Sequence, residues 1–239
     1  MLAAVITARG GSKRLPGKNI LPFRGKPMLA WPIEACLACG LFDHVYVSTE
    51  DPEIRDVALA YGAEVPVDRP AELATDAARA VEAVRHTLDW VATHVGPVRA
   101  FAHLYPTAPL LKADDIRQAY ALLEQGRSYV YTAQKISFPV YQIVTRGKGG
   151  GVENLFPPEL AGRKSQQMPD AFIDAGQLYW YETRAFYDGD LSNAMILELP
   201  AWRAVDIDTA DDLRFAELCA EYCHQQDSLR RLQGESDGT

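Results

Sequence analysis

This sequence lacks a long apolar run, and that absence excludes one class of protein. No apolar stretch approaches the about 20 residues that a membrane-spanning helix needs. The apolar residues 2–7 precede the first basic residue, whereas a secretory signal carries its positive charge before the apolar segment. We therefore expect a cytoplasmic protein that has no membrane partner.

The sequence also lacks an excess of basic charge. Its formal net charge is −8 at pH 7 over 239 residues. Nonspecific binding to nucleic acid or to an anionic membrane needs a broad basic face, so we expect no nucleic acid as partner and a small ligand instead. With 48% hydrophobic residues, the chain has enough apolar material for one main domain.

Cysteine is scarce, with four residues in two pairs near opposite ends of the chain. Cys36 and Cys39 form a CxxC pair, and Cys219 and Cys223 with His224 could complete a split zinc site. Both pairs fall in apolar helical patterns, where cysteine behaves as a small hydrophobic residue. The favoured interpretation is therefore a set of reduced thiols in the core.

A glycine-rich basic loop follows the apolar run 2–7. The loop reads ARGGSKRLPGKN at residues 8–19. It contains three glycines and four cations, namely Gly10, Gly11, Gly17, Arg9, Lys13, Arg14 and Lys18. Glycine lets backbone N–H groups approach an anion, and a hydrogen bond from a charged donor contributes about 1.5–3 kcal/mol. The loop predicts a polyphosphate site, and the alternative is a turn whose basic residues are merely solvated.

The standard nucleotide-binding motifs are absent from this loop. A Walker A loop needs GxxxxGK followed by Ser or Thr, but five residues separate Gly11 from Gly17 and Asn19 replaces the hydroxyl. The dinucleotide motif GxGxxG is also missing, because Gly10 and Gly11 are adjacent. A kinase or ATPase fits poorly, and a triphosphate is favoured over a dinucleotide.

Strand-like apolar runs alternate with amphipathic helical stretches along most of the chain. Strands are expected at 2–7, 44–48, 64–67, 100–105, 129–133, 177–180 and 194–199, and helices at 28–39, 53–61, 77–94, 113–125 and 210–222. This alternation predicts an α/β fold with a doubly wound, mostly parallel sheet.

The alternation fails over a stretch that is too long for an ordinary loop. This stretch contains a glycine cluster at 147–151 and two prolines at 157–158. Its spaced aromatic and leucine residues favour an arm that packs on a second subunit, and a disordered insertion is the alternative. We expect a nucleotide-binding core at 1–134 and 176–224, the irregular dimerisation arm at 135–175 and a flexible tail at 225–239.

A pair of aspartates precedes the last expected helix. Asp206 and Asp208 flank Ile207 at what the pattern predicts is a strand end, so alternation puts both carboxylates on one face. Two carboxylates about 7 Å apart on a strand can hold Mg²⁺ against substrate phosphates. The alternative is that Asp208 caps the helix.

Further polar motifs follow other expected strands. They are Ser-Thr-Glu at 48–50, Arg-Pro-Ala-Glu-Leu at 69–73 with Asp76 nearby, and Tyr-Pro-Thr-Ala-Pro at 105–109. Ligands bind at the carboxyl ends of parallel strands, although each motif could also form a simple turn. Arg69 is the residue among them that is least typical of a turn.

Taken together and in order, these motifs resemble a known enzyme family. ARGGSKRLPGKN, Val-Ser-Thr-Glu at 47–50, Arg-Pro-Ala-Glu-Leu, Pro-Thr-Ala-Pro-Leu at 106–110 and Asp-Ile-Asp-Thr at 206–209 are similar to those of the CMP-sialic acid synthetases, the acylneuraminate cytidylyltransferase family. The stretch DAGQLYW at 174–180 resembles the pseudaminic acid cytidylyltransferases within it. Tyr105 and Leu111 depart from the sialic acid pattern, and Lys164 keeps legionaminic acid open as the sugar.

The resemblance implies a nucleotide-diphospho-sugar transferase, Rossmann-like fold and a reaction of CTP with a nonulosonic acid. The products would be the CMP-sugar and pyrophosphate, with pseudaminic acid favoured over N-acetylneuraminic or legionaminic acid. Two other classes remain open from the residues, a metal-dependent glycosyltransferase and a non-catalytic nucleotide-binding module. The sequence reveals no dedicated general base, and either an aspartate or a metal-bound water could take the proton of the sugar hydroxyl.

The resemblance also implies roles for individual residues. The nucleotide would be bound by Ala8, Arg9, Gly10, Gly11, Ser12, Lys18, Asn19, Arg69 and Thr107. The sugar would be bound by Tyr105, Lys164, Gln166, Asp174 and Gln177. The expected catalytic residues are Arg9, Lys18, Asp206 and Asp208, and the two aspartates would carry Mg²⁺. The implied assembly is a homodimer in which Lys135 or Arg146 completes the neighbouring site.

Overall fold

Strand β1 (Leu2–Thr7) is an interior strand of the main sheet, and its mostly apolar sequence is buried at every position after Leu2. The computed structural model describes residues 1–161 and 169–232. Strand β1 pairs in parallel with β4 (His44–Ser48) on one side and with β5 (Ala100–Leu104) on the other. Its last residue, Thr7, leads directly into the basic loop.

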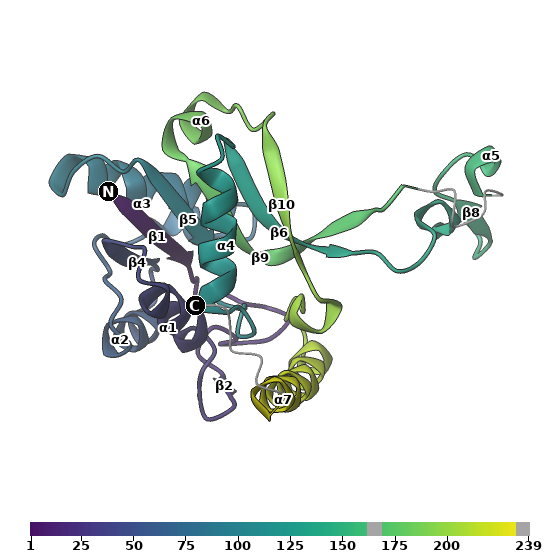
Figure 1. The fold of residues 1–239 in the computed structure, drawn as a ribbon, viewed down its shortest axis with the longest axis horizontal. Coiled ribbons are helices and arrows are strands. Elements are labelled where there is room, and N and C mark those ends of the chain that lie inside the picture. Colours follow the sequence, from purple (N-terminus) through teal and green to yellow (C-terminus); the bar gives the residue numbers. More distant parts are fainter. Residues whose placement is uncertain (162–168, 233–239) are drawn as a thin grey trace.

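The main sheet has six strands in the order β10-β6-β9-β5-β1-β4 (Figure 1). Strands β6 (Tyr129–Lys135) and β10 (Ala194–Leu199) pair in parallel, whereas β9 (Phe172–Glu182) is antiparallel to both β5 and β6. The expected α/β fold with a mostly parallel sheet is confirmed. Its one antiparallel strand, β9, lies between the two parallel groups.

Helices cover both faces of the sheet. Helices α1 (Ala30–Cys39), α2 (Pro52–Ala60) and α4 (Ala113–Leu123) contribute to one apolar cluster. Helices α3 (Ala80–His94) and α6 (Thr183–Asp188) contribute to a second cluster on the opposite face. The connections of the core also contain short elements, namely β2 (Pro22–Phe23), β3 (Lys26–Pro27) and the 3-10 helices η1 (Ala71–Ala74) and η4 (Ala201–Arg203).

The strand expected at 64–67 and the last expected helix differ clearly from the structure. The strand expected at 64–67 is reduced to a single bridge between Tyr46 and Glu64, because Pro66 has no N–H to extend the ladder. The last helix, α7 (Ala210–Leu232), continues beyond the predicted end at 222 and includes the first residues of the expected flexible tail. Its polar sequence there still consists of good helix formers, chiefly Gln, Leu and Arg.

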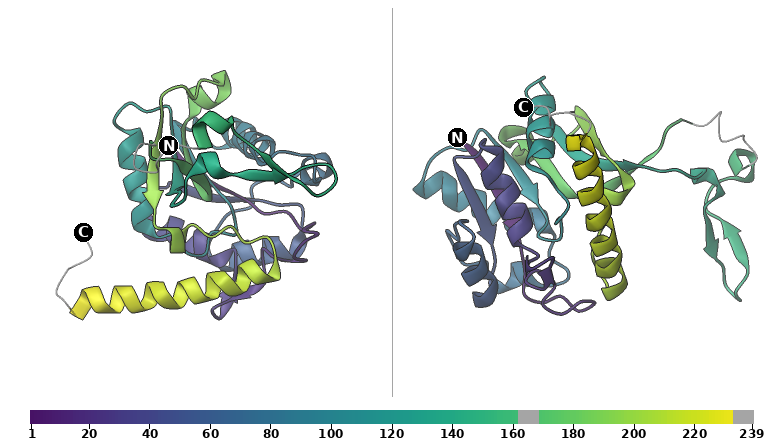
Figure 2. Two further views of the ribbon diagram at one scale, coloured as in Figure 1. Left: turned by 90° about the vertical axis from the view of Figure 1, so that its right-hand side faces the viewer. Right: turned by 60° about the horizontal axis from the view of Figure 1, so that its bottom comes forward.

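The described part of the segment between β6 and β9 projects away from the sheet, as Figure 1 and the right-hand view of Figure 2 show. It contains the 3-10 helix η2 (Val140–Gln142), an antiparallel hairpin of β7 (Val144–Arg146) and β8 (Val152–Asn154), and the short helix α5 (Pro158–Ala161). Several large apolar side chains here are exposed, including Phe138, Val144, Val152 and Leu155. The described part of this segment therefore has some regular structure, and its role as a dimerisation arm stays a prediction.

The cysteines are free thiols. Cys36 and Cys39 belong to the cluster under α1, whereas Cys219 packs in a separate cluster under α7. Residues 1–161 and 169–232 contain no group of three or more side chains placed to hold a metal ion, so the split zinc site is not formed there. In the same residues, no helix is both long and apolar enough to cross a membrane.

Candidate active site

The basic loop is held against the segment that follows β4. The backbone N–H of Ala8 donates to the Ser48 carbonyl at 3.0 Å, and the N–H of Gly10 donates to Glu50 Oε1 at 2.8 Å. A Cβ atom on Gly10 would lie 3.1 Å from Asp51 Cγ and would overlap its carboxylate oxygen. Close packing against Asp51 therefore explains the glycine at position 10. The sequence pattern alone had explained this glycine by the approach of an anion.

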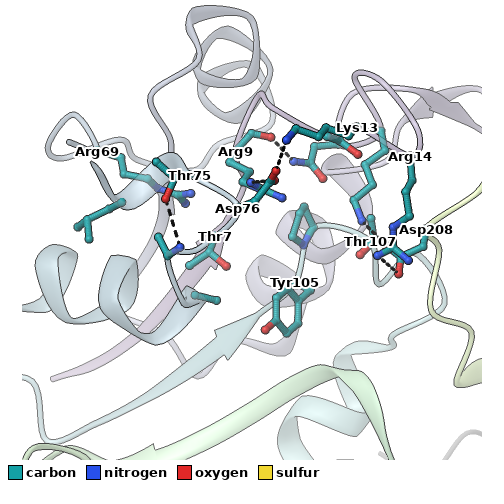
Figure 3. A pocket seen from close by; sticks show the side chains of 17 residues that line it. Thr7, Arg9, Lys13, Arg14, Arg69, Thr75, Asp76, Tyr105, Thr107 and Asp208 are labelled. Carbon is teal, nitrogen blue, oxygen red and sulfur yellow. Dashed lines mark hydrogen bonds and ion pairs between the residues drawn. The ribbon is translucent and has the colours of Figure 1, made fainter. Parts of the chain in front are cut away.

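A cavity of about 500 Å³ opens between this loop and the carboxyl ends of β1 and β5 (Figure 3). Eight of the predicted site residues line it: Arg9, Ser12, Lys18, Asn19, Arg69, Tyr105, Thr107 and Asp208. Lys13 and Arg14 line it as well. The structure therefore brings together side chains from four of the five sequence motifs.

Other predicted site residues lie elsewhere. Ala8, Gly10 and Gly11 do not line the cavity, although they belong to the loop that forms its wall. Asp174, Gln177 and Asp206 do not line it either. Lys164 and Gln166 lie outside the described residues.

The four cations of the loop converge on two carboxylates. Arg14 NH2 and Lys18 Nζ lie 2.6 and 3.0 Å from the two oxygens of Asp208. Arg9 NH1 and Lys13 Nζ lie 2.7 and 2.6 Å from the two oxygens of Asp76. Sequence reasoning noted Asp76 beside the Arg-Pro-Ala-Glu-Leu motif but assigned it no role at the site.

Arg69 is almost fully buried at the inner end of the cavity. Its Nε donates to Ser48 Oγ at 3.1 Å, a second nitrogen donates to the Ser48 carbonyl, and NH1 lies 3.9 Å from Glu50 Oε2. Burial lowers the pKa of Arg69 to about 10, an effect that the Glu50 carboxylate opposes. Arg69 is therefore a fixed cation at neutral pH.

A buried histidine lies below the cavity and was missed by sequence reasoning. His103 Nε2 and Thr7 Oγ1 form a hydrogen bond of 3.0 Å, and Thr7 lines the cavity. Burial, with a smaller effect of the Arg69 charge, lowers the pKa of His103 to about 3. The imidazole is therefore neutral at physiological pH, and it supports Thr7 instead of carrying charge. Its only sequence signal is a polar residue within an apolar strand.

The residues predicted to bind the sugar divide into two groups. Tyr105 lines the cavity, and Asp174 accepts hydrogen bonds from the Tyr179 hydroxyl at 2.9 Å. Burial and the charge of Asp174 raise the pKa of Tyr105, so its hydroxyl stays protonated. Gln177, in contrast, is only 1% exposed, and its Nε2 donates to the Arg203 carbonyl at 2.7 Å.

Asp206 and Asp208 do not lie at the end of a strand, so that prediction was wrong. The 3-10 helix η4 follows β10, and residues 204–208 connect η4 to α7 without pairing with any strand. The predicted alternation nevertheless holds, since Val205 and Ile207 are buried while Asp206 and Asp208 face outwards. Burial and the neighbouring Asp208 charge raise the pKa of Asp206.

Asp208 is not the cap of the last helix. Thr209 Oγ1 accepts from the N–H of Asp212 at 3.3 Å, and Asp212 Oδ2 accepts from the N–H groups of Asp208 and Thr209. This reciprocal pair is a capping box, so the helix is capped without the Asp208 side chain. Asp208 remains available to the cavity.

Comparison with known proteins identifies the family of this chain. The family model described as cytidylyltransferase matches residues 3–147. A pseudaminic acid cytidylyltransferase of Campylobacter jejuni is 34% identical over 92% of this chain and 97% of its own length. The chain belongs to the cytidylyltransferase family. The predicted enzyme class, a nucleotidyltransferase that uses CTP, is thereby confirmed.

Other relatives act on related sugars by name. A CMP-N,N'-diacetyllegionaminic acid synthase of Legionella pneumophila is 38% identical over 66% of this chain and 67% of its own length. The fold is similar to that of a CMP:2-keto-3-deoxy-manno-octonic acid synthetase solved in complex with CTP, with a TM-score of 0.67, 18% identity and coverage of 94% of this chain and 99% of the other. This cytidylyltransferase family member therefore shares its fold with that synthetase.

Proposed function

We propose that this cytidylyltransferase activates a nonulosonic acid, with pseudaminic acid as the favoured sugar. The anomeric hydroxyl of the sugar attacks the α-phosphorus of CTP and gives up its proton to a carboxylate of the site or to water, the bond between the α-phosphorus and the bridging oxygen breaks, and pyrophosphate leaves. The cavity between the basic loop and Arg69 is the observation that carries this proposal, because it gathers five cations at the carboxyl edge of the sheet. The similarity to the Campylobacter enzyme over nearly the whole chain supports the choice of sugar.

The cationic residues supply what phosphoryl-type transfer needs most, which is positioning and neutralisation of charge. Arg9, Lys18 and Ser12 bind the triphosphate, and Arg69 lies deeper, where it orients the ribose and base. Holding two substrates in a reactive geometry can contribute about 7–11 kcal/mol to lowering the barrier. The rigid contacts of Arg69 with Ser48 fit such a positioning role.

Mg²⁺ fits the acidic pair. Asp206 and Asp208 face the same side of the chain and repel each other, and this repulsion raises the pKa of Asp206. A divalent cation held by these two carboxylates would relieve the repulsion and would neutralise charge on the phosphates. Before such binding, ion pairs with Lys18 and Arg14 hold Asp208 at the edge of the cavity.

The assembly that we propose is a homodimer. The projecting segment exposes Phe138, Val144 and Val152 by 59%, 49% and 75%, which is unfavourable unless another surface covers them. On this proposal the arm packs on the partner, and Lys135 or Arg146 approaches the neighbouring cavity. Light scattering at assay concentration tests it, and a fully active monomer would refute it.

The decisive experiment measures pyrophosphate release with Mg²⁺ and CTP. Pseudaminic, legionaminic and N-acetylneuraminic acids are compared, with GTP and UTP as controls. Turnover confined to CTP and pseudaminic acid is the expected result, whereas preference for legionaminic acid would correct only the sugar. No pyrophosphate with any sugar would refute the synthetase reaction and favour a glycosyltransferase or a binding module.

A further inference from the structure

The turn between η1 and α3 brings a carboxylate directly onto the basic loop. Asp76 Oδ1 accepts a hydrogen bond from Arg9 NH1 at 2.7 Å, and Asp76 Oδ2 lies 2.6 Å from Lys13 Nζ. Figure 3 shows Asp76 between these two side chains at the cavity. Two of the four loop cations are therefore occupied by a residue that follows them by more than 60 positions in the sequence.

Local hydrogen bonds order this turn. Thr75 Oγ1 donates to the Glu72 carbonyl at 3.3 Å and accepts from the N–H of Ala78 at 3.3 Å. Arg9 also donates to the Ala74 carbonyl at 3.5 Å. The carboxylate of Asp76 is thus presented to the loop by an ordered turn.

Asp76 differs from the other carboxylate at the cavity. Asp208 has Asp206 beside it and fits a divalent cation, whereas Asp76 belongs to no group of three or more metal-ligating side chains within residues 1–161 and 169–232. Hydrogen bonds from Lys13 and Arg9 lower the pKa of Asp76, so it is a full anion at neutral pH. A carboxylate in this position presents to the cations the same kind of oxygen that a phosphate would present.

We propose that Asp76 sets the affinity of the site for polyphosphate by competing with it for Arg9 and Lys13. The proposal rests on the proposed function, because it takes the loop to be the triphosphate site. Exposed ion pairs are weak, so a ligand with several negative charges displaces Asp76 when it binds. The same competition then weakens the hold on pyrophosphate and favours its release.

The test is a calorimetric titration of the full chain in low-salt buffer without divalent cations. Pyrophosphate, CTP and cytidine are titrated into the wild type, Asp76→Asn and the control Glu72→Gln. Glu72 lies in η1 just before this turn, has an exposed side chain, and forms no ion pair with any described residue. The control therefore removes one negative charge close to the turn without touching the loop.

Asp76→Asn is expected to bind pyrophosphate and CTP about 3- to 10-fold more tightly, which is the size of two exposed ion pairs. Cytidine affinity is expected to be unchanged, because cytidine carries no phosphate. Unchanged or weaker pyrophosphate binding by Asp76→Asn would overturn the proposal, and so would equal tightening by Glu72→Gln. Failure of the wild type to bind CTP while pyrophosphate still binds would refute the proposed function instead.

Discussion

Replacing Gly10 with alanine tests how closely the basic loop depends on the segment after β4. The new Cβ would lie 3.1 Å from Asp51 Cβ and Cγ and would overlap the carboxylate. That carboxylate cannot move freely, because Asp51 Oδ1 caps helix α2 by accepting from the N–H groups of Glu53 and Ile54 at 2.9 and 3.1 Å. Either the cap or the loop has to shift.

The expected cost follows from the two contacts at risk. Loss of the α2 cap costs about 1 kcal/mol, and strain on the hydrogen bond between the Gly10 N–H and Glu50 costs a similar amount. A total of about 2 kcal/mol lowers the melting temperature by about 4–8 °C in a chain of this size. A shifted loop also raises the KM for CTP, because its cations no longer converge on the cavity.

Gly11→Ala is the matched control, since a Cβ at position 11 meets nothing within 4 Å. Its melting temperature is expected to stay within about 1 °C of the wild type. In the Gly10→Ala background, Asp51→Ser should restore part of the lost stability, because serine caps the helix with a shorter side chain. Equal melting temperatures for Gly10→Ala and Gly11→Ala would refute the packing argument.

Three further predictions concern buried or charged groups of the site. Because the folded-state pKa of His103 is about 3 while its unfolded value is near 6.5, protonation favours unfolding. Lowering the pH from 7 to 5 should therefore reduce the free energy of unfolding of the wild type by about 2 kcal/mol more than that of His103→Gln, as measured by urea denaturation. Arg69→Lys loses the paired hydrogen bonds to Ser48 and should raise the KM for CTP about 10-fold or more in steady-state assays, whereas an unchanged KM would remove Arg69 from the nucleotide site. Asp206→Asn removes the repulsion with Asp208 and half of the proposed metal site, so the Mg²⁺ concentration for half-maximal pyrophosphate release should rise about 10-fold or more; an unchanged Mg²⁺ requirement would contradict the assignment.

The sequence predicted correctly the strands that a local run of apolar residues defines. The apolar run before the basic loop is β1, and the run at 44–48 is β4 with the same bounds. Strand β9 was predicted over only four residues, because Asp174 and Gly176 at its start have low strand propensity. Pairing with β6 extends it there, and such long-range pairing leaves no local signal.

The site follows the same division between local and distant contacts. Arg69 and Lys18 are visible in the sequence as cations beside glycine or proline, and both line the cavity. His103 and Asp76 gain their roles only from partners nearly 100 and 67 residues away, Thr7 and Arg9. Sequence spacing cannot reveal which distant group neutralises a cation or supports a hydroxyl.

Gln177→Ala tests whether Gln177 binds the sugar or instead stabilises the protein through an internal hydrogen bond. Gln177 is buried and donates to the Arg203 carbonyl at 2.7 Å, and Arg203 in turn pairs with buried Asp115, so the glutamine anchors the chain that leads to Asp206. Loss of this hydrogen bond should lower the free energy of unfolding by about 1 kcal/mol. It should also reduce kcat, by the same factor for each sugar that the enzyme accepts. Gln177→Glu places a buried carboxylate against the carbonyl oxygen and should lower stability further than Gln177→Ala does. A rise in KM for one sugar alone, with stability unchanged, would instead assign Gln177 to sugar binding.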